Sequence, residues 1–238
     1  MFQNPKTQKL ALVVANGPLP DGVAQLETFA AVAALRVAAD GGARHFLAAG
    51  LLPHFLVGDL DSLPASDLDA LQKAGVAVLR HPARKDATDL ELALDVALAQ
   101  GADEVVVLAA LGARWDQTLA NMLLLALERY DRVPMCVVAG AQTLRVLRPG
   151  RAHQLAGASG DTLSLIPIAG PAAGITTSGL DYPMKHGTLP FGATLGVSNV
   201  LTSATASVTL ESGLLLADIL SAQLKSSNRL HLCLATHP

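Results

Sequence analysis

Short apolar runs alternate with segments of helical spacing along the first part of the chain. The run from Leu10 to Ala15 is apolar throughout, which is typical of a strand buried on both faces of a sheet. Because the runs alternate with segments of helical periodicity, the pattern predicts parallel strands covered by helices. The predicted strands span residues 10–15, 35–39, 55–57, 76–79, 104–109 and 134–139. The predicted helices span residues 23–33, 43–49, about 64–75, a segment after 88, and 118–129.

Two of these helices have a clear apolar stripe. The sequence Thr88-Asp89-Leu90-Glu91 has the spacing of a capping box, so Thr88 is expected to cap the helix that follows it. The expected core face of that helix is Leu90, Leu94 and Leu98. The expected core face of the 118–129 helix is Leu119, Leu123 and Leu127.

The rhythm changes beyond about residue 145, where helical periodicity stops. Strand-like runs follow between glycines and prolines, at residues 161–168, 174–177, 194–198, 206–210 and 214–219. Glu211-Ser212-Gly213 predicts a hairpin turn between the last two. The expected fold is therefore an α/β parallel-sheet (Rossmann-like) N-terminal domain, residues 1–145, followed by an all-β sandwich C-terminal domain, residues 146–238. The stretch 221–238 is either a tail or an added strand.

Composition narrows the class of protein. With 238 residues, of which 51% are hydrophobic and 16% charged, the chain can bury a sizeable core. A net charge of −3 and few aromatic residues provide neither the basic surface nor the stacking platform of a nucleic-acid-binding protein. Cys136 and Cys233 lack metal-ligand spacing and indicate small core residues in a reduced compartment. No run reaches the roughly 18 apolar residues of a membrane span, so we expect a cytoplasmic protein with no membrane or nucleic-acid partner.

Acidic residues gather where two successive predicted strands end. Asp59 and Asp61 follow the 55–57 strand, and Lys85-Asp86-Ala87-Thr88-Asp89 follows the 76–79 strand. Ligands of open parallel sheets bind at this edge, and carboxylate oxygens suit a Mg²⁺ ion that carries phosphate groups. Helix capping could explain one aspartate, and the helix dipole could explain Asp89. Neither explains four aspartates beside Lys85, and the pattern therefore favours a metal–nucleotide site.

Three further strand ends carry candidate ligand-binding residues. Asn16 follows the first strand, Asp40-Gly41-Gly42 follows the second, and Arg114 lies after the fifth. Paired glycines allow a ligand to approach the backbone closely, or simply permit a sharp turn. Arg114 could bind a phosphate through two parallel donors, or could be a solvated loop residue.

Seven motifs in order resemble those of thiamine pyrophosphokinase, also called thiamine diphosphokinase. They are Ala39-Asp40-Gly41-Gly42, Gly58-Asp59-Leu60-Asp61-Ser62, Lys85-Asp86-Ala87-Thr88-Asp89-Leu90-Glu91, Gly112-Ala113-Arg114-Trp115-Asp116-Gln117-Thr118-Leu119-Ala120-Asn121, Ser164-Leu165-Ile166-Pro167, Gly179-Leu180-Asp181-Tyr182-Pro183 and Gly196-Val197-Ser198-Asn199. Single motifs of this length are weak signals, whereas seven in sequence, covering about residues 10–216, are highly specific.

The resemblance implies an enzyme that moves the terminal diphosphate of ATP to the hydroxyl of thiamine, giving thiamine diphosphate and AMP. It also implies a homodimer whose active site is shared between the first domain of one subunit and the second domain of its partner. Matched position by position, the implied catalytic residues are Asp59, Asp61, Asp86 and Asp89, and the implied Mg²⁺ ligands are the first three. The implied nucleotide and phosphate contacts are Asn16, Asp40, Gly41, Gly42, Lys85, Arg114 and Asp116, and those for thiamine are Ser198 and Asn199.

Departures from the family pattern concern mainly the thiamine side. Ala113 replaces the second glycine of a usual pair, and Gln117 stands where the family often has histidine. No aromatic residue follows Asn199 in the segment 200–204, so Leu201, Tyr182 or Phe191 would have to pack on the thiamine rings. Two alternatives stay open. One is a related diphosphokinase acting on another primary alcohol, such as a hydroxymethylpterin, and the other is a non-enzymatic nucleotide- or thiamine-binding module.

Overall fold

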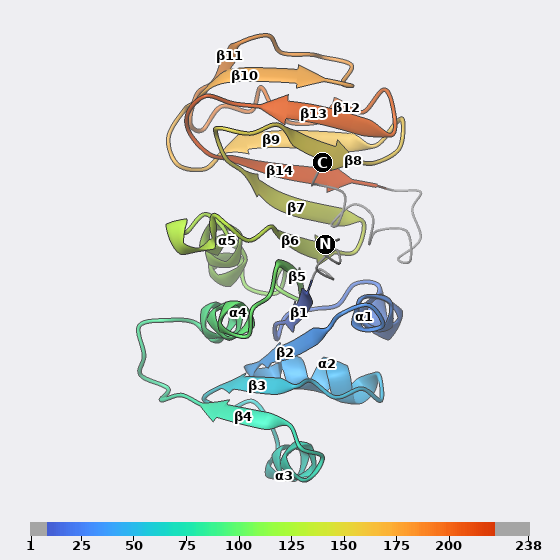
Figure 1. The fold of residues 1–238 in the computed structure, drawn as a ribbon, viewed down its shortest axis with the longest axis vertical. Helices are drawn as coiled ribbons and strands as arrows, with labels where there is room; N and C mark the ends of the chain where they lie inside the picture. The colour runs from blue at the N-terminus through green and yellow to red at the C-terminus, as the bar shows by residue number, and fades with distance from the viewer. Residues whose placement is uncertain (1–8, 222–238) are drawn as a thin grey trace, which may run out of the picture. The chain divides into compact units, whose positions relative to one another are not determined.

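The computed structural model describes residues 9–221 of the chain (Figure 1). These residues divide into two compact units, the first made of residues 9–124 and 129–135 and the second of residues 125–128 and 136–221. Residues 136–145, expected in the first domain, therefore group with the second unit. The functions expected of the two domains, nucleotide binding and catalysis for the first and thiamine binding and dimerisation for the second, stay predictions.

The first unit contains a parallel sheet, as the sequence pattern predicted. Its strands lie in the order β5-β1-β2-β3-β4, and every neighbouring pair is parallel. Strands β1 and β5 are buried at every position, which explains their unbroken apolar runs. The strands are β1 Leu10–Val14, β2 Leu35–Ala39, β3 Phe55–Gly58, β4 Ala77–Arg80 and β5 Glu104–Leu108.

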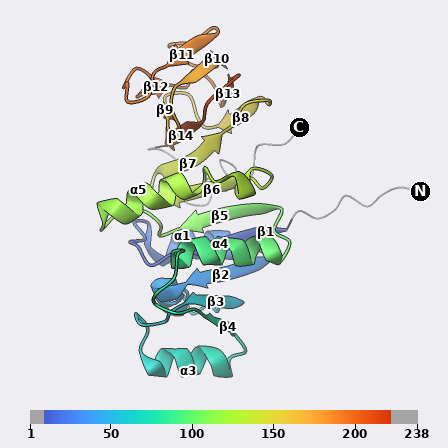
Figure 2. The same cartoon turned by 90° about the vertical axis from the view of Figure 1, so that its left-hand side faces the viewer.

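The helices between these strands begin close to where the pattern placed them. They are α1 Gly22–Ala30, α2 Ala43–Ala48, α3 Ala65–Lys73, α4 Asp89–Ala99 and α5 Trp115–Leu124, with short 3-10 helices η1 Asp40–Gly42 and η2 Glu128–Tyr130. Helix α4 packs on β1, β2 and β3, and Figure 2 shows it in front of these strands. Thr88 caps α4 as predicted, its Oγ1 accepting a hydrogen bond of 3.2 Å from the Glu91 backbone N–H. The buried face of α4 is Leu90, Ala93, Leu94 and Ala97.

Helix α5 corrects one prediction. Leu119 and Leu123 have the expected spacing but are 55% and 40% exposed, and Trp115 is 87% exposed. Leu127, which lies beyond the end of α5 at Leu124, is 37% exposed. Within α5 only Thr118 is buried. Periodicity defines which residues share a face and leaves open what covers that face, so the assignment of these leucines to the core of the chain was wrong.

The second unit is built from antiparallel strands in two sheets, with strand orders β12-β9-β14-β7-β6 and β11-β10-β13-β8. Residues of both sheets, among them Leu163, Ile175, Val208 and Leu215, form one hydrophobic core. The strands are β6 Met135–Ala139, β7 Gln142–Leu147, β8 His153–Ala156, β9 Thr162–Pro167, β10 Ala172–Ser178, β11 Gly187–Leu189, β12 Asn199–Val200, β13 Thr205–Thr209 and β14 Leu215–Leu220.

Two predictions for this unit were wrong. Residues 194–198 form a loop rather than a strand, and Gly196 there lies so close to β9 that an added Cβ would be 2.2 Å from the Leu165 carbonyl oxygen. Glu211-Ser212-Gly213 makes no hairpin, because β13 pairs with β8 and β10 whereas β14 pairs with β7 and β9. The turn instead carries the chain from one sheet to the other.

Cys136 is buried in β6, as predicted for a small core residue, and the reduced compartment expected from the cysteines stays a prediction. Cys233 and residues 222–238 lie outside the described part of the chain. Across residues 9–221, none of the helices combines the length and the apolar character that crossing a membrane requires.

Candidate functional site

Three carboxylates from different elements meet at the carboxyl edge of the parallel sheet. Asp40 comes from η1, Asp59 follows β3 and Asp89 begins α4, and each places an oxygen within 4.8 Å of the other two. Asp40 is only 8% exposed; its Oδ2 accepts a hydrogen bond of 2.5 Å from Ser62 Oγ. Its Oδ1 is buried and has no hydrogen-bond partner among the described residues. A buried carboxylate oxygen left unpaired is unfavourable, so this arrangement suits an added cation.

Lys85 lies among these carboxylates. Its Nζ is 2.8 Å from Asp89 Oδ1 and 3.6 Å from Asp59 Oδ2, and its side chain is largely buried. We call Asp40, Asp59, Asp89 and Lys85 the acidic cluster. Three carboxylates against one ammonium leave the cluster negative, which suits both a divalent cation and the phosphates that such a cation carries.

The charges of the acidic cluster shift one another's protonation. A hydrogen bond of 3.2 Å from the Asp61 backbone N–H, followed by the charge of Lys85, lowers the pKa of Asp59. The negative charge of Asp59 in turn raises the pKa of Asp61. Although burial opposes it, the hydrogen bond to Asp89 raises the pKa of Lys85 overall. Lys85 and Asp59 therefore carry their full charges at neutral pH.

The backbone around the acidic cluster is held in conformations that side chains rarely adopt. Asp40, Leu60 and Ala109 have φ values of 44°, 67° and 55°, each at or just after the end of a strand. Gly58 has φ 153°, and a Cβ there would lie 3.0 Å from both Asp40 Cβ and Asp89 Oδ1. Glycine at residue 58 thus lets the carboxylates of Asp40 and Asp89 approach. Such strain clusters at functional sites, where the surrounding structure maintains it.

The loop after β5 presents Arg114. Its Nη2 and Nε contact the two carboxylate oxygens of Asp116 at 2.5 and 3.2 Å, with both side chains about two-thirds exposed. The same hydrogen bonds lower the pKa of Asp116 and raise that of Arg114. The loop itself is anchored by Thr118, whose Oγ1 accepts from Gly112 N–H at 2.9 Å, and by Asn121, whose Nδ2 donates to Ala110 O at 2.7 Å. An ordered loop thus holds an exposed guanidinium.

Of the other residues predicted for the site in the first unit, Asn16 lies beside Gly41, whereas Asp61 and Asp86 lie outside the carboxylate trio. Asn16 lies against Gly41, since a Cβ on Gly41 would be 2.2 Å from Asn16 Oδ1. Asp61 and Asp86 are exposed and do not belong to the carboxylate trio, and their role as metal ligands stays a prediction. The sequence suggested only helix capping for Ser62, the hydrogen-bond donor to Asp40, although its place directly after Asp61 in the Asp-x-Asp-Ser motif was a usable signal for the site.

Ser198 and Asn199 belong to the second unit. Ser198 is exposed with φ 62°, and its N–H donates to Ser164 Oγ at 3.1 Å. The Asn199 side chain is engaged locally: Oδ1 accepts from Tyr182 N–H at 3.1 Å and Nδ2 donates to Tyr182 O at 2.8 Å. Asn199 therefore organises the backbone of a neighbouring segment, whereas the Ser198 hydroxyl is presented to solvent.

Comparison with known proteins identifies the family. A model described as thiamin pyrophosphokinase, catalytic domain, matches residues 26–137, and one described as thiamin pyrophosphokinase, vitamin B1 binding domain, matches residues 152–215. The crystal structure of thiamin pyrophosphokinase from Geobacillus thermodenitrificans matches with a TM-score of 0.77 and 30% identity, over 90% of this chain and 98% of that one. The chain belongs to the thiamine pyrophosphokinase family.

Other thiamine pyrophosphokinases agree over most of their length. The Bacillus subtilis protein is 28% identical over 207 residues, which are 86% of this chain and 95% of that protein. A crystal structure from the same organism has a TM-score of 0.78 with 27% identity, over 91% of this chain and all of that one. The catalytic-domain match includes the whole acidic cluster, and the vitamin B1 binding match includes Ser198 and Asn199. Membership of this enzyme family confirms the resemblance seen in the motifs.

Proposed function

We propose that this protein transfers diphosphate from ATP to thiamine in a Mg²⁺-dependent reaction, giving thiamine diphosphate and AMP. The hydroxyl oxygen of thiamine bonds to the β-phosphorus of ATP, and the bond from that phosphorus to the oxygen shared with the α-phosphorus breaks. AMP leaves with that oxygen and its electron pair, and the hydroxyl proton is released. The observation that carries the proposal is the acidic cluster, which joins metal-binding carboxylates and a lysine at the ligand-binding edge of the sheet.

The acidic cluster fits Mg²⁺. Asp40, Asp59 and Asp89 supply hard oxygen ligands from three elements, and the unpaired, buried Oδ1 of Asp40 would gain a partner. We propose that these three residues hold the ion, with Asp61 and Asp86 reaching it directly or through water. A bound Mg²⁺ would neutralise phosphate charge and help orient the diphosphate that is transferred.

Cationic side chains would stabilise the charge that develops during transfer. Lys85 is held by Asp59 and Asp89, so its ammonium is oriented before a phosphate arrives. Arg114 presents a planar guanidinium that matches phosphate oxygens with two donors, and Asp116 keeps it in place. Asn16 and the Gly41-Gly42 backbone would line the nucleotide at the ends of β1 and β2.

The thiamine side belongs to the second unit in this proposal. Ser198 would contact thiamine through its exposed hydroxyl, and Asn199 would support it by fixing the backbone around Tyr182. Tyr182 is 72% exposed, so its ring is available to pack against the substrate in place of the missing aromatic residue. We further propose that the second unit is a β-sandwich, that the first is Rossmann-like, and that the enzyme works in the cytoplasm.

The exposed stripe of α5 supports a homodimer. Trp115, Leu119 and Leu123 lie at successive i, i+4 positions, and a large exposed apolar patch on one helix face marks an interaction surface. Size-exclusion chromatography with light scattering would test this. A dimer that Leu119→Glu converts to a monomer supports the assignment, and a wild-type monomer that retains full activity contradicts the shared site.

The reaction is tested by following AMP release from ATP and Mg²⁺ with and without thiamine, identifying the product by mass. Thiamine-dependent AMP with thiamine diphosphate is expected, while AMP release only with another primary alcohol would reassign the acceptor. Asp59→Asn should lower turnover by about 100-fold or more, whereas Asp69→Asn, an exposed aspartate on α3, should leave it unchanged. Full turnover by Asp59→Asn would refute the metal assignment.

A further inference from the structure

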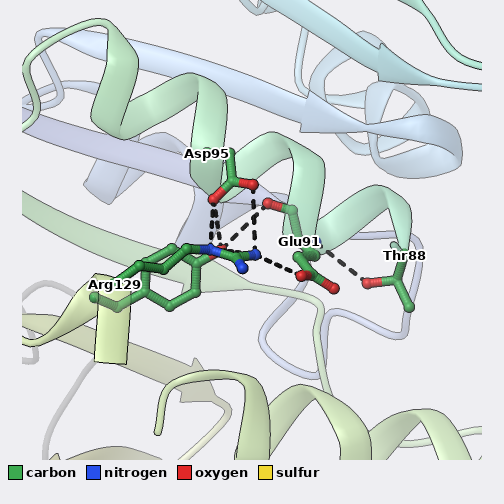
Figure 3. Close-up of polar contacts among 5 residues, drawn as sticks. Thr88, Glu91, Asp95 and Arg129 are labelled. Carbon is green, nitrogen blue, oxygen red and sulfur yellow. Dashed lines mark hydrogen bonds and ion pairs between the residues drawn. The ribbon is translucent and has the colours of Figure 1, made fainter. Parts of the chain in front are cut away.

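Arg129 connects the short helix η2 to the first turns of α4. Its Nε donates to Asp95 Oδ1 at 3.1 Å, and its Nη2 pairs with the Glu91 carboxylate (Figure 3). The neighbouring Tyr130 donates its hydroxyl proton to the same Asp95 oxygen at 2.8 Å. The Arg129 guanidinium carbon also lies 4.9 Å from the centroid of the Tyr130 ring. Two consecutive residues of η2 thus hold two acidic side chains of α4.

The ion pair between Arg129 and Glu91 replaces part of the usual capping arrangement at the N-terminus of α4. The Glu91 N–H donates to Thr88 Oγ1 at 3.2 Å, which is one half of a capping box. In the other half, the glutamate side chain would return to the backbone of the capping residue. Among the described residues, the Glu91 carboxylate instead pairs with Arg129. The first turn of α4 is therefore anchored from outside the helix.

That turn carries Asp89, the carboxylate nearest to Lys85. Thr88 caps the turn, Asp89 begins it, and Glu91 lies two residues further on. A helix turn moves as a unit because its backbone hydrogen bonds link these residues. Any rotation or fraying at Glu91 would move the carboxylate of Asp89 relative to Lys85 and Asp59.

We infer that Arg129 is a positioning residue of the acidic cluster, holding the first turn of α4 so that Asp89 stays in place for the metal. This inference deepens the proposed function and rests on it. A role in stability alone is the competing explanation. It is a weaker one, because the Arg129 side chain is 46% exposed and surface ion pairs contribute little to folding. Tyr130, by contrast, is 2% exposed, so the segment bearing Arg129 is itself well anchored.

The test compares Arg129→Met with Arg129→Lys in the full-length protein. Mn²⁺ would serve as the probe, its affinity measured by electron paramagnetic resonance without substrates. We expect Arg129→Met to weaken Mn²⁺ binding by about tenfold, the lower end of what supporting residues contribute at metal sites. The Mg²⁺ concentration for half-maximal AMP release should rise by a similar factor. Arg129→Lys should retain part of the Mn²⁺ affinity that Arg129→Met loses, because an ammonium keeps the positive charge but cannot bind two carboxylates with the geometry of a guanidinium.

Arg132→Met provides a matched control, since Arg132 is an exposed arginine three residues further along the same segment. It should leave both metal measurements unchanged. Thermal unfolding of each variant separates positioning from stability. If Arg129→Met lowered the melting temperature while metal affinity stayed at the wild-type value, the positioning role would be refuted. Failure of the proposed function would give a different result, because the wild type would then release no AMP in response to thiamine. The Mn²⁺ affinities of the variants would still decide the role of Arg129.

Discussion

The side-chain amide of Asn199 is hydrogen-bonded on both sides to the backbone of Tyr182. Oδ1 accepts from the Tyr182 N–H at 3.1 Å and Nδ2 donates to its carbonyl at 2.8 Å, while the Val200 N–H also donates to Oδ1 at 2.8 Å. An amide used in this way has little hydrogen-bonding capacity left for a substrate. We therefore expect Asn199 to affect thiamine binding through the segment that it holds.

The first prediction concerns this route. Asn199→Ala should destabilise the fold by about 1–3 kcal/mol, because it leaves backbone groups of Tyr182 and Val200 without partners. It should also raise the KM for thiamine while leaving the KM for ATP near the wild-type value. Steady-state kinetics of Asn199→Ala, Tyr182→Ala and the double variant form the measurement. Because the two residues act as one unit, their effects on KM should be less than additive, and full additivity would indicate a direct contact between Asn199 and thiamine.

The second prediction concerns Asp40, whose buried Oδ1 is unpaired among the described residues. Asp40→Asn should raise the free energy of unfolding by about 1 kcal/mol, because it removes a buried charge of which one oxygen, Oδ1, has no partner among the described residues. Asparagine tolerates the φ of 44° at this position, so the backbone should not change. Mg²⁺-dependent turnover should nevertheless fall by about 100-fold or more.

Urea denaturation and AMP release measure the two effects of Asp40→Asn. Ser62→Ala is a useful companion, since it removes the hydrogen bond to Asp40 Oδ2 and leaves the charge. It should therefore lower stability, in the opposite direction to Asp40→Asn. A loss of stability in Asp40→Asn would mean that the carboxylate is stabilised by a group other than the metal.

Much of the fold followed from apolar periodicity, and its failures have physical causes. The parallel sheet was predictable because strands such as β1 and β5 are buried throughout, so their sequences are continuously apolar. The face of α5 was not predictable, because Leu119 and Leu123 have the spacing of a core stripe but are exposed in this chain. Strands β11 and β12 have three and two residues, too short to show any period.

The candidate site was predictable where short motifs end strands and not where contacts join distant segments. Asp59, Lys85 and Asp89 were found because their spacing and position at strand ends carry chemical meaning. Arg129 was not found, since 38 residues separate it from Glu91 and nothing local to either residue indicates the pair. The hydrogen bonds between Asn199 and Tyr182 could not be predicted either, because the two residues are 17 positions apart and meet only in the folded chain.

The third prediction is that alanine substitutions at the adjacent residues Gly41 and Gly42 differ in their effect on stability. A Cβ on Gly42 would lie 2.1 Å from the Val14 carbonyl oxygen, a backbone atom of the central strand β1. Gly42→Ala should therefore lower the free energy of unfolding by about 3 kcal/mol. The three atoms nearest to a Cβ on Gly41 all belong to the exposed side chain of Asn16, which can rotate away. Gly41→Ala should change stability by no more than about 1 kcal/mol, and equal effects of the two in urea denaturation would contradict the role assigned to Gly42.

The fourth prediction concerns pH and His153, which is 7% exposed in β8. Its Nε2 lies 2.8 Å from the carbonyl oxygen of Arg148 and 3.1 Å from its backbone nitrogen. Burial lowers the pKa of His153, so below about pH 6.5 the unfolded chain takes up a proton there before the folded chain does. Stability should therefore decrease as the pH falls from about 6.5 toward the lower folded pKa.

His153→Gln tests this assignment, because glutamine can place an amide near Nε2 but does not titrate. The free energy of unfolding of this variant should vary less with pH than that of the wild type over about pH 5 to 8. His54, whose pKa burial also lowers, is present in both proteins and cancels in the comparison. If the two pH profiles were parallel, the folded and unfolded chains would bind protons at His153 equally, and its burial would carry no linkage to stability.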